Sequence, residues 1–92
     1  MKKIFEIVKK IPCGKVITYN ELAKKLKTSP RAVGRMLNRN EHPIIIPCHR
    51  VVMSDGRIGG YKLGTEKKKE LLMKEGVIIK NNKVSKEYFF YL

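Results

Sequence analysis

Apolar residues recur at helical spacing near the start of the chain and predict an amphipathic helix over about residues 2–10. The repeated positions are Ile4, Ile7, Val8 and Ile11. Side chains spaced three and four residues apart share one face of an α-helix, so these four form a single apolar stripe. Pro12 and Gly14 follow and predict the end of the helix.

Start signals predict two further helices. Thr18 and Glu21 have the spacing of a capping box, in which each side chain accepts a hydrogen bond from the other residue's free backbone N–H. Ser29 followed by Pro30 is typical of an N-cap and a first helical residue. Only a break at residues 27–28 separates the two helices. So close a pair predicts a helix-turn-helix.

Apolar runs beside turn-forming residues predict two β-hairpins in the second half of the chain. Residues 51–53 and 57–58 flank the turn at 54–56, and residues 77–79 and 84 flank Asn81-Asn82. A fourth helix is expected between them, capped by Thr65 and ended by Gly76. The aromatic tail, residues 88–91, is expected to pack on the core. The predicted fold class is α+β, mostly helical: a small winged helix-turn-helix-like domain with short β-hairpins.

Charge adds more to this picture than length does. The 92 residues fit one domain, and their 21 Lys and Arg against 8 Asp and Glu give a formal net charge of +13. A polyanion is therefore the first partner to expect.

No apolar run approaches the roughly 20 residues of a membrane span, and we expect an intracellular, cytoplasmic protein without a membrane partner. Two cysteines without a CxxC pair predict neither a disulfide framework nor a metal site.

Arginines of the third helix form a stripe of one charge sign. Arg31, Arg35 and Arg39 are spaced four residues apart, and no acidic residue occurs between Glu21 and Glu41. A charge run is usually a solvated face, but the missing acidic partners favour phosphate contact. Ala32 and Gly34 on the same helix add small side chains that would permit close approach to a narrow groove.

Cys48 and His49 form the most informative dipeptide of the chain. A catalytic cysteine needs a histidine, a cation or a hydrogen-bond network to supply thiolate character, and His49 and Arg50 are the nearest candidates. For an arbitrary Cys-His pair, a small buried core cysteine beside a satisfied histidine is the commoner situation. The spacing of other motifs reverses that preference.

Several spaced motifs together resemble one known family. They are Ile11-Pro12-x-Gly14-x-Val16-x-Thr18-Tyr19, Arg31-Ala32-Val33-Gly34, Asn40, Pro47-Cys48-His49-Arg50-Val51, Gly59, Tyr61 and Leu71-Leu72-x-x-Glu75-Gly76. Their order and spacing over roughly residues 4–79 resemble the DNA-binding and catalytic domain of O6-alkylguanine-DNA alkyltransferases, or methylated-DNA-protein-cysteine methyltransferases. A chance coincidence of so many motifs is far less expected than of any one.

The resemblance implies direct reversal of DNA damage. Cys48 would take an alkyl group from O6 of guanine and keep it, so each molecule would act once, as a methylated-DNA-protein-cysteine S-methyltransferase. His49 would reach the thiol through a water, with Glu75 behind it, and Tyr19 and Lys68 would supply donors to the departing guanine. The residues alone leave open that Glu75 pairs with a surface lysine and that Lys68 is solvated. Arg50 matches a largely structural arginine.

The resemblance also implies how DNA is bound. The substrate would be double-stranded DNA, entered from the minor groove by the helix-turn-helix, with the damaged nucleotide flipped out and Arg31 in the vacated stack. DNA contacts would come from Arg31, Ala32, Gly34, Arg35 and Arg39, and the alkylguanine pocket from Asn40, Tyr61, Gly59 and Leu37. The alternative for Tyr61 is a core aromatic residue without a role in binding. No cofactor is implied, and we expect a monomer.

A second class of function stays open. Longer relatives carry an additional N-terminal domain, and we expect residues 1–92 to form a single domain without it. Short alkyltransferase-like proteins resemble this domain, bind alkylated DNA and recruit excision-repair proteins without transfer, but usually have Trp or Ala in place of the cysteine. Cys48 favours transfer over such a damage sensor. A plain winged-helix transcription factor comes third, because it would not need Cys48, His49 and Glu75 together.

Overall fold

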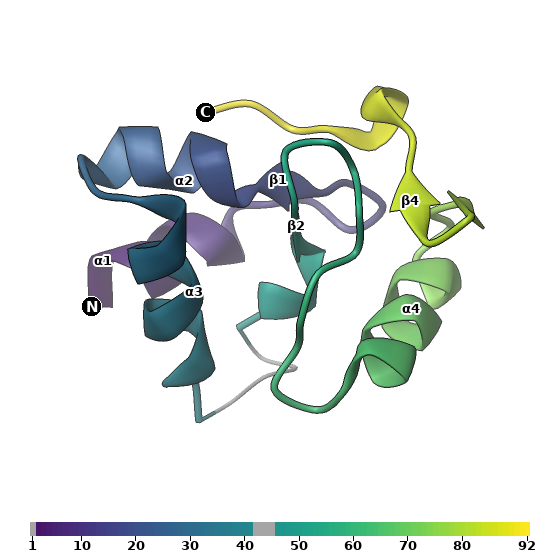
Figure 1. Cartoon of the computed structure of the whole chain (residues 1–92), viewed down its shortest axis with the longest axis horizontal. Helices are drawn as coiled ribbons and strands as arrows, with labels where there is room; N and C mark the ends of the chain where they lie inside the picture. Colours follow the sequence, from purple (N-terminus) through teal and green to yellow (C-terminus); the bar gives the residue numbers. More distant parts are fainter. Residues whose placement is uncertain (1, 42–45) are drawn as a thin grey trace.

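The computed structural model describes residues 2–41 and 46–92 and confirms a mostly helical α+β domain (Figure 1). The described helices are α1 (Lys2–Lys9), α2 (Tyr19–Leu26), α3 (Pro30–Asn38) and α4 (Thr65–Lys74). The described strands are β1 (Ile17–Thr18), β2 (Val51–Val52), β3 (Ile79–Lys80) and β4 (Lys83–Val84). Two single-turn 3₁₀ helices, Cys48–Arg50 and Lys86–Tyr88, complete these elements.

The helix-turn-helix is confirmed at α2 and α3, and both helices begin where the side-chain caps predict. Thr18 Oγ1 accepts a hydrogen bond from the Glu21 N–H at 3.0 Å, and Ser29 Oγ accepts one from the Ala32 N–H at 3.1 Å. The Glu21 carboxylate accepts from the backbone N–H of Leu92, so it connects α2 to the end of the chain. Lys27 ends α2 in the left-handed conformation, at φ 56°, and this residue makes the tight turn into α3.

Helices α1, α2 and α3 pack around one apolar cluster that includes the expected stripe of α1. Figure 1 shows the three helices on one side of the molecule and α4 with the β3–β4 hairpin on the other. A second cluster lies where the β1–β2 pair meets α4 and the β3–β4 hairpin. Its buried members are Val16, Val52, Ile58, Leu72, Val77 and Val84.

The first predicted hairpin is wrong in its strand pairing. Val51 and Val52 pair in parallel with Ile17 and Thr18 of β1. Arg57 instead forms an antiparallel bridge with Lys83, in β4 of the second hairpin. Three of the four paired residues are fully buried apolar side chains, as is typical of parallel strands covered on both faces. The predicted turn does form.

Gly56 explains why this turn faces β4. Its backbone lies at φ +92°, and a Cβ there would lie 2.4 Å from the Val84 carbonyl oxygen. The same close approach allows the Val84 N–H to donate to the Gly56 carbonyl at 2.8 Å. Only glycine fits a left-handed position with backbone so near.

Helix α4 ends as predicted, but its N-cap lies one residue earlier in the chain than predicted. Gly64, at φ 97°, is the N-cap, and Thr65 is already helical, so the prediction of Thr65 as the cap is wrong. A glycine takes this left-handed position without steric cost. At the other end, the Gly76 N–H donates to Met73 and the Val77 N–H donates to Leu72, which is a Schellman motif.

The second hairpin is confirmed, although its first strand starts at Ile79. Asn81 and Asn82 have φ values of 53° and 59°, as a two-residue type I′ turn requires. The aromatic tail packs on the core at Tyr88, Phe89 and Phe90, while Tyr91 is 64% exposed. Among the described helices, none has the length and apolar character to cross a membrane.

Candidate active site

Cys48 begins the 3₁₀ turn Cys48–Arg50, which leads directly into β2, where the parallel pairing with β1 holds the backbone. The thiol is nearly buried, with 5% of the residue exposed. Asn40, which is also buried, donates from Nδ2 to Cys48 Sγ at 3.2 Å and to the Ile46 carbonyl at 3.0 Å. The Asn40 amide therefore fixes the position of the sulfur.

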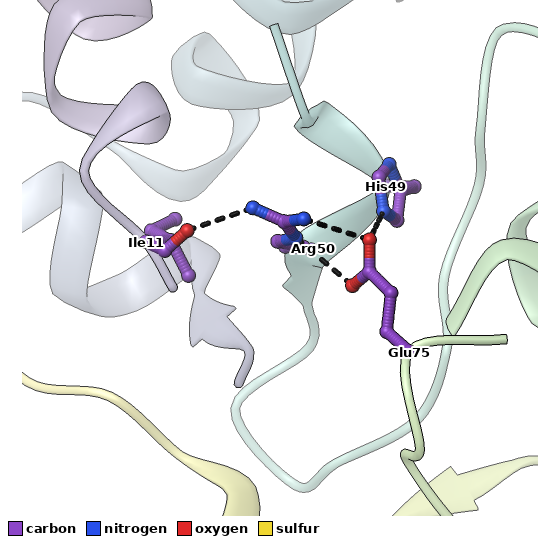
Figure 2. A network of polar contacts seen from close by, with 4 residues as sticks. All are labelled: Ile11, His49, Arg50 and Glu75. Atoms are coloured by element: carbon purple, nitrogen blue, oxygen red, sulfur yellow. Dashed lines mark hydrogen bonds and ion pairs between the residues drawn. The ribbon is translucent and has the colours of Figure 1, made fainter. Parts of the chain in front are cut away.

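Glu75 lies between two cationic or titratable partners, as Figure 2 shows. Its Oε2 is 2.9 Å from His49 Nε2, and its two oxygens accept from Arg50 Nε at 2.9 Å and from Arg50 Nη2 at 2.7 Å. The third Arg50 contact is a donation from Nη1 to the Ile11 carbonyl at 2.8 Å. Arg50 therefore ties the C-cap of α4 to the segment after α1, and it orients the carboxylate toward His49.

The protonation states of this network follow from its surroundings. Burial raises the pKa of Glu75, but the hydrogen bonds from Arg50 and His49 outweigh it, so the net pKa is lowered and the carboxylate is ionised at neutral pH. Burial lowers the pKa of His49 despite the raising effect of Glu75, so the imidazole is neutral there. A neutral imidazole next to a carboxylate carries its proton on Nε2.

The other ring nitrogen of His49 is then the basic one. Nδ1 is buried and has no hydrogen-bond partner in the part of the chain that the structure describes. A buried nitrogen with a free lone pair, on a ring next in sequence to Cys48, can accept a proton. This arrangement leaves Nδ1 open to a proton, while Glu75 sets the orientation of the ring.

The Cys48 thiol opens onto a cavity of about 350 Å³ between α3 and the loop that precedes α4. The lining residues are Tyr19, Gly34, Leu37, Asn38, Cys48, Gly60, Tyr61 and Lys62. Of the predicted pocket residues, Leu37 and Tyr61 line this cavity, and Asn40 lies behind Cys48. The fourth, Gly59, lines a neighbouring hollow.

Lys68 is fully buried, although it stands in a run of three lysines. Its residue exposure is 0%, its Nζ donates to the Gly60 carbonyl at 3.0 Å, and it lies 5.8 Å from the centroid of the Tyr19 ring. Burial lowers the pKa of Lys68 to about 8. The solvated-lysine alternative is therefore excluded for Lys68, and so is a surface pairing for Glu75.

Both tyrosines of the cavity keep their protons at neutral pH. Burial, and then the charge of Cys48, raises the pKa of Tyr19 and raises that of Tyr61 to about 12. Tyr61 also meets the His49 ring edge-on, with centroids 6.4 Å apart. The cavity thus presents hydroxyl donors beside a sulfur nucleophile.

Helix α3 presents its arginines to solvent, as predicted. Arg31, Arg35 and Arg39 are exposed and Ala32 is half-buried. Arg31 and Gly34 both line the neighbouring hollow, which has a volume of about 430 Å³ and shares Tyr19, Gly34 and Gly60 with the Cys48 cavity. A Cβ on Gly34 would meet nothing within 4 Å, so internal packing does not explain this mid-helix glycine.

Two contacts of the site were not anticipated from sequence. The sequence suggests Arg50 as a neighbour of Cys48 or as a largely structural arginine, and neither interpretation predicts its double contact with Glu75. The Lys62 Nζ donates to the Asn40 carbonyl at 2.6 Å from the rim of the cavity. No local pattern marks Lys62, which follows Tyr61 in a loop.

Comparisons with known proteins point to the same chemistry. A family model described as "6-O-methylguanine DNA methyltransferase, DNA binding domain" matches residues 1–77. A methylated-DNA–protein-cysteine methyltransferase of Methanocaldococcus jannaschii is 52% identical over 87 residues, which are 95% of this chain and 52% of that protein. The chain spans about half the length of the curated relatives it matches.

Two solved structures, one of a methyltransferase and one of Atl1, are similar to this chain. The O6-methylguanine-DNA methyltransferase of Pyrococcus kodakaraensis KOD1 superposes with a TM-score of 0.77 at 57% identity, over 83% of this chain and 45% of that one. Schizosaccharomyces pombe Atl1, in complex with damaged DNA containing O6-carboxymethylguanine, superposes with a TM-score of 0.86 at 30% identity, over 99% of this chain and 94% of that one.

Fold and site together define a helix-turn-helix domain with a buried cysteine thiol beside a histidine–carboxylate pair. With the match over residues 1–77, the chain belongs to the 6-O-methylguanine DNA methyltransferase family, in its DNA-binding domain.

Proposed function

We propose that the protein repairs DNA by transferring an alkyl group from O6 of guanine to Cys48. The observation that carries this proposal is the nearly buried thiol, which faces a cavity of about 350 Å³ and adjoins the His49–Glu75 pair. The volume falls in the range of roughly 300–1,000 Å³ that small-molecule sites occupy. A methyl carbon on a base inside a duplex cannot reach this thiol, so the nucleotide must be flipped out.

The transfer balances with groups of this site. The Cys48 proton passes to His49 Nδ1 through a bridging water, and the ionised Glu75 stabilises the imidazolium that results. Sulfur then attacks the alkyl carbon, an S–C bond forms, and the C–O6 bond breaks with its electron pair left on guanine. The Tyr19 hydroxyl and the Lys68 ammonium meet the charge that develops on the departing base. Because the thioether is not cleaved, each molecule acts once.

The DNA contacts that we propose lie on α3. Arg31, Arg35 and Arg39 are exposed and would contact phosphates or the vacated stack, and the bare position at Gly34 would allow the minor groove to approach. Arg31 lines the hollow next to the base cavity, a position that supports its role in holding the flipped state. A DNA substrate would place the protein inside the cell, in the cytoplasm and associated with DNA.

A damage sensor is the second candidate, because the structure of Atl1 in complex with damaged DNA superposes with a TM-score of 0.86, against 0.77 for the KOD1 methyltransferase. Such a sensor would bind O6-alkylguanine DNA and recruit excision-repair proteins. Its site would need a pocket but no nucleophile. The ordered surroundings of Cys48 favour transfer.

Intact mass decides between the two. After incubation with duplex DNA containing O6-methylguanine, transfer adds about one methylene, ~14 Da, to Cys48. Cys48→Ser should take up no mass yet bind the duplex with nearly unchanged affinity, because phosphate contacts supply most of the binding. Tight binding without a mass gain in the wild-type chain would establish the sensor, and a gain that persists in Cys48→Ser would refute Cys48 as the acceptor.

A further inference from the structure

The cavity beside Cys48 has two walls that come from different parts of the chain. One wall is the second half of α3, with Leu37 and Asn38, and the other is the loop from Gly60 to Lys62. Leu37 and Cys48 are buried and form the floor, whereas Asn38 and Lys62 are exposed and form the rim. In Figure 1 this loop descends from the segment after β2 toward the end of α3 before it enters α4.

A side-chain contact joins the two walls at the rim. The Lys62 Nζ donates to the carbonyl oxygen of Asn40, which follows α3, at 2.6 Å. A hydrogen bond from a charged donor at this distance is among the stronger kinds. Asn40 is also the residue that donates to Cys48 Sγ, so the bridge is anchored on the backbone that holds the thiol.

The middle of the loop is held by Tyr61, which packs on the core and meets the His49 ring, and whose carbonyl accepts from the Gly64 N–H at 3.0 Å. Gly60 and Gly64 have open space where a side chain would be, and Gly59 takes a left-handed backbone at φ +75°. The floor end of the loop is held by buried Lys68 through the Gly60 carbonyl. At the rim, the Lys62 bridge adds a contact between this loop and the segment after α3.

We propose that the Lys62–Asn40 bridge sets the aperture of the cavity, which makes Lys62 a specificity-determining residue for the size of the group that reaches Cys48. This inference rests on the proposed function where the group is an alkyl substituent on guanine. The aperture itself is a property of the cavity, and it applies to any electrophile that approaches the thiol. Lys62 acts by positioning the loop and does not touch the reacting atoms.

The test compares a small and a bulky thiol reagent, so that it does not depend on DNA or on alkyl transfer. Rates of modification of Cys48 by iodoacetamide and by fluorescein maleimide are measured in a Cys13→Ser background, because Cys13 is an exposed second thiol. Lys62→Met, which removes the donor but keeps the chain length, should raise the maleimide-to-iodoacetamide rate ratio about fivefold. Lys62→Arg should restore the wild-type ratio, and Lys74→Met on the far end of α4 serves as the control.

A second comparison uses free bases, which carry no phosphate for Lys62 to contact. Lys62→Met should raise the rate of transfer from O6-benzylguanine relative to O6-methylguanine, while Lys62→Arg should not. An unchanged reagent ratio in Lys62→Met, or an equal rise in Lys62→Arg, overturns the proposal. If the reagent ratio shifts but no variant takes up an alkyl group, the aperture stands and the proposed function fails.

Discussion

Glu75 contacts two side chains, His49 and Arg50, so a substitution at Glu75 affects both the site and the stability of the fold. It orients His49 and opposes the lowering of the His49 pKa by burial, and it also neutralises Arg50, whose other contact reaches the Ile11 carbonyl. The resemblance alone predicts a carboxylate in a proton network and no role in stability. The ion pair is largely buried, with side-chain exposures of 15% for Arg50 and 14% for Glu75, so loss of one partner leaves an uncompensated charge.

We expect Glu75→Gln to lower the free energy of unfolding by about 2–4 kcal/mol, measured by urea denaturation. It should also slow the reaction of Cys48 with iodoacetamide at neutral pH, with recovery at higher pH, where hydroxide removes the thiol proton instead. Glu70→Gln is the control, because Glu70 is half-exposed and its pairs with Lys67 and Lys74 are surface pairs. Stability loss with an unchanged pH profile would leave Glu75 a purely structural role.

Lys68 links the site to stability through pH. Its pKa is about 8 in the folded chain against 10.5 for the ordinary side chain, so between these values the unfolded chain binds more protons. The burial penalty is fully present below pH 8 and is relieved as pH rises toward 10.5. We therefore expect the free energy of unfolding of the wild type to rise, relative to Lys68→Met, by up to about 3 kcal/mol from pH 7.5 to pH 10. Parallel pH curves for the two proteins would contradict the buried charge.

Among the secondary-structure elements, those with local signals were predicted from sequence and those with distant partners were not. Each helix start is marked by residues that lie within four positions of one another in sequence, Thr18 for α2 and Ser29 with Pro30 for α3. Both helices were therefore predicted correctly. The partner of Val51-Val52 was not, because a two-residue apolar strand carries no information on what it pairs with. The Asn81-Asn82 turn succeeded because its geometry is local.

Gly34 offers a test that separates the helix from its proposed partner. Its Cβ position is empty, and Gly in a helix interior is less favourable than Ala, so Gly34→Ala should stabilise the fold by about 1 kcal/mol. The added methyl would stand between α3 and the DNA groove, and we expect weaker binding of duplex DNA. Thermal unfolding and fluorescence anisotropy measure the two effects. A stabilised variant that binds DNA as tightly as the wild type would remove Gly34 from the proposed interface.

For the molecule as a whole, the sequence located the nucleophile and its neighbours better than the contacts that fix their geometry. The motif spacing placed Cys48, His49 and Glu75 together, and the structure brings His49 and Glu75 into direct contact. The bridge from Lys62 to the Asn40 carbonyl was missed, since a hydrogen bond to a backbone oxygen does not depend on the identity of the acceptor residue. Side-chain to main-chain contacts of this kind need coordinates.

The net charge of +13 predicts how DNA binding should respond to salt. If α3 faces the phosphates, Arg35→Gln should make the slope of log K against log salt concentration shallower by about 0.9, the value for one lost phosphate contact. Lys74→Gln, on the opposite side of the molecule, should leave the slope unchanged. Equal effects of the two substitutions would indicate a diffuse attraction without a defined face.

The Arg50 contacts have a kinetic consequence. They join the segment after α1, the segment of Cys48 and the end of α4, so long loops must close before they form, whereas the α2–α3 pair forms within one short stretch. Substitutions at Arg50 are expected to accelerate unfolding in stopped-flow experiments and to leave the refolding rate nearly unchanged. Under mild denaturation the chain would then lose the surroundings of its nucleophile before it loses its basic helices.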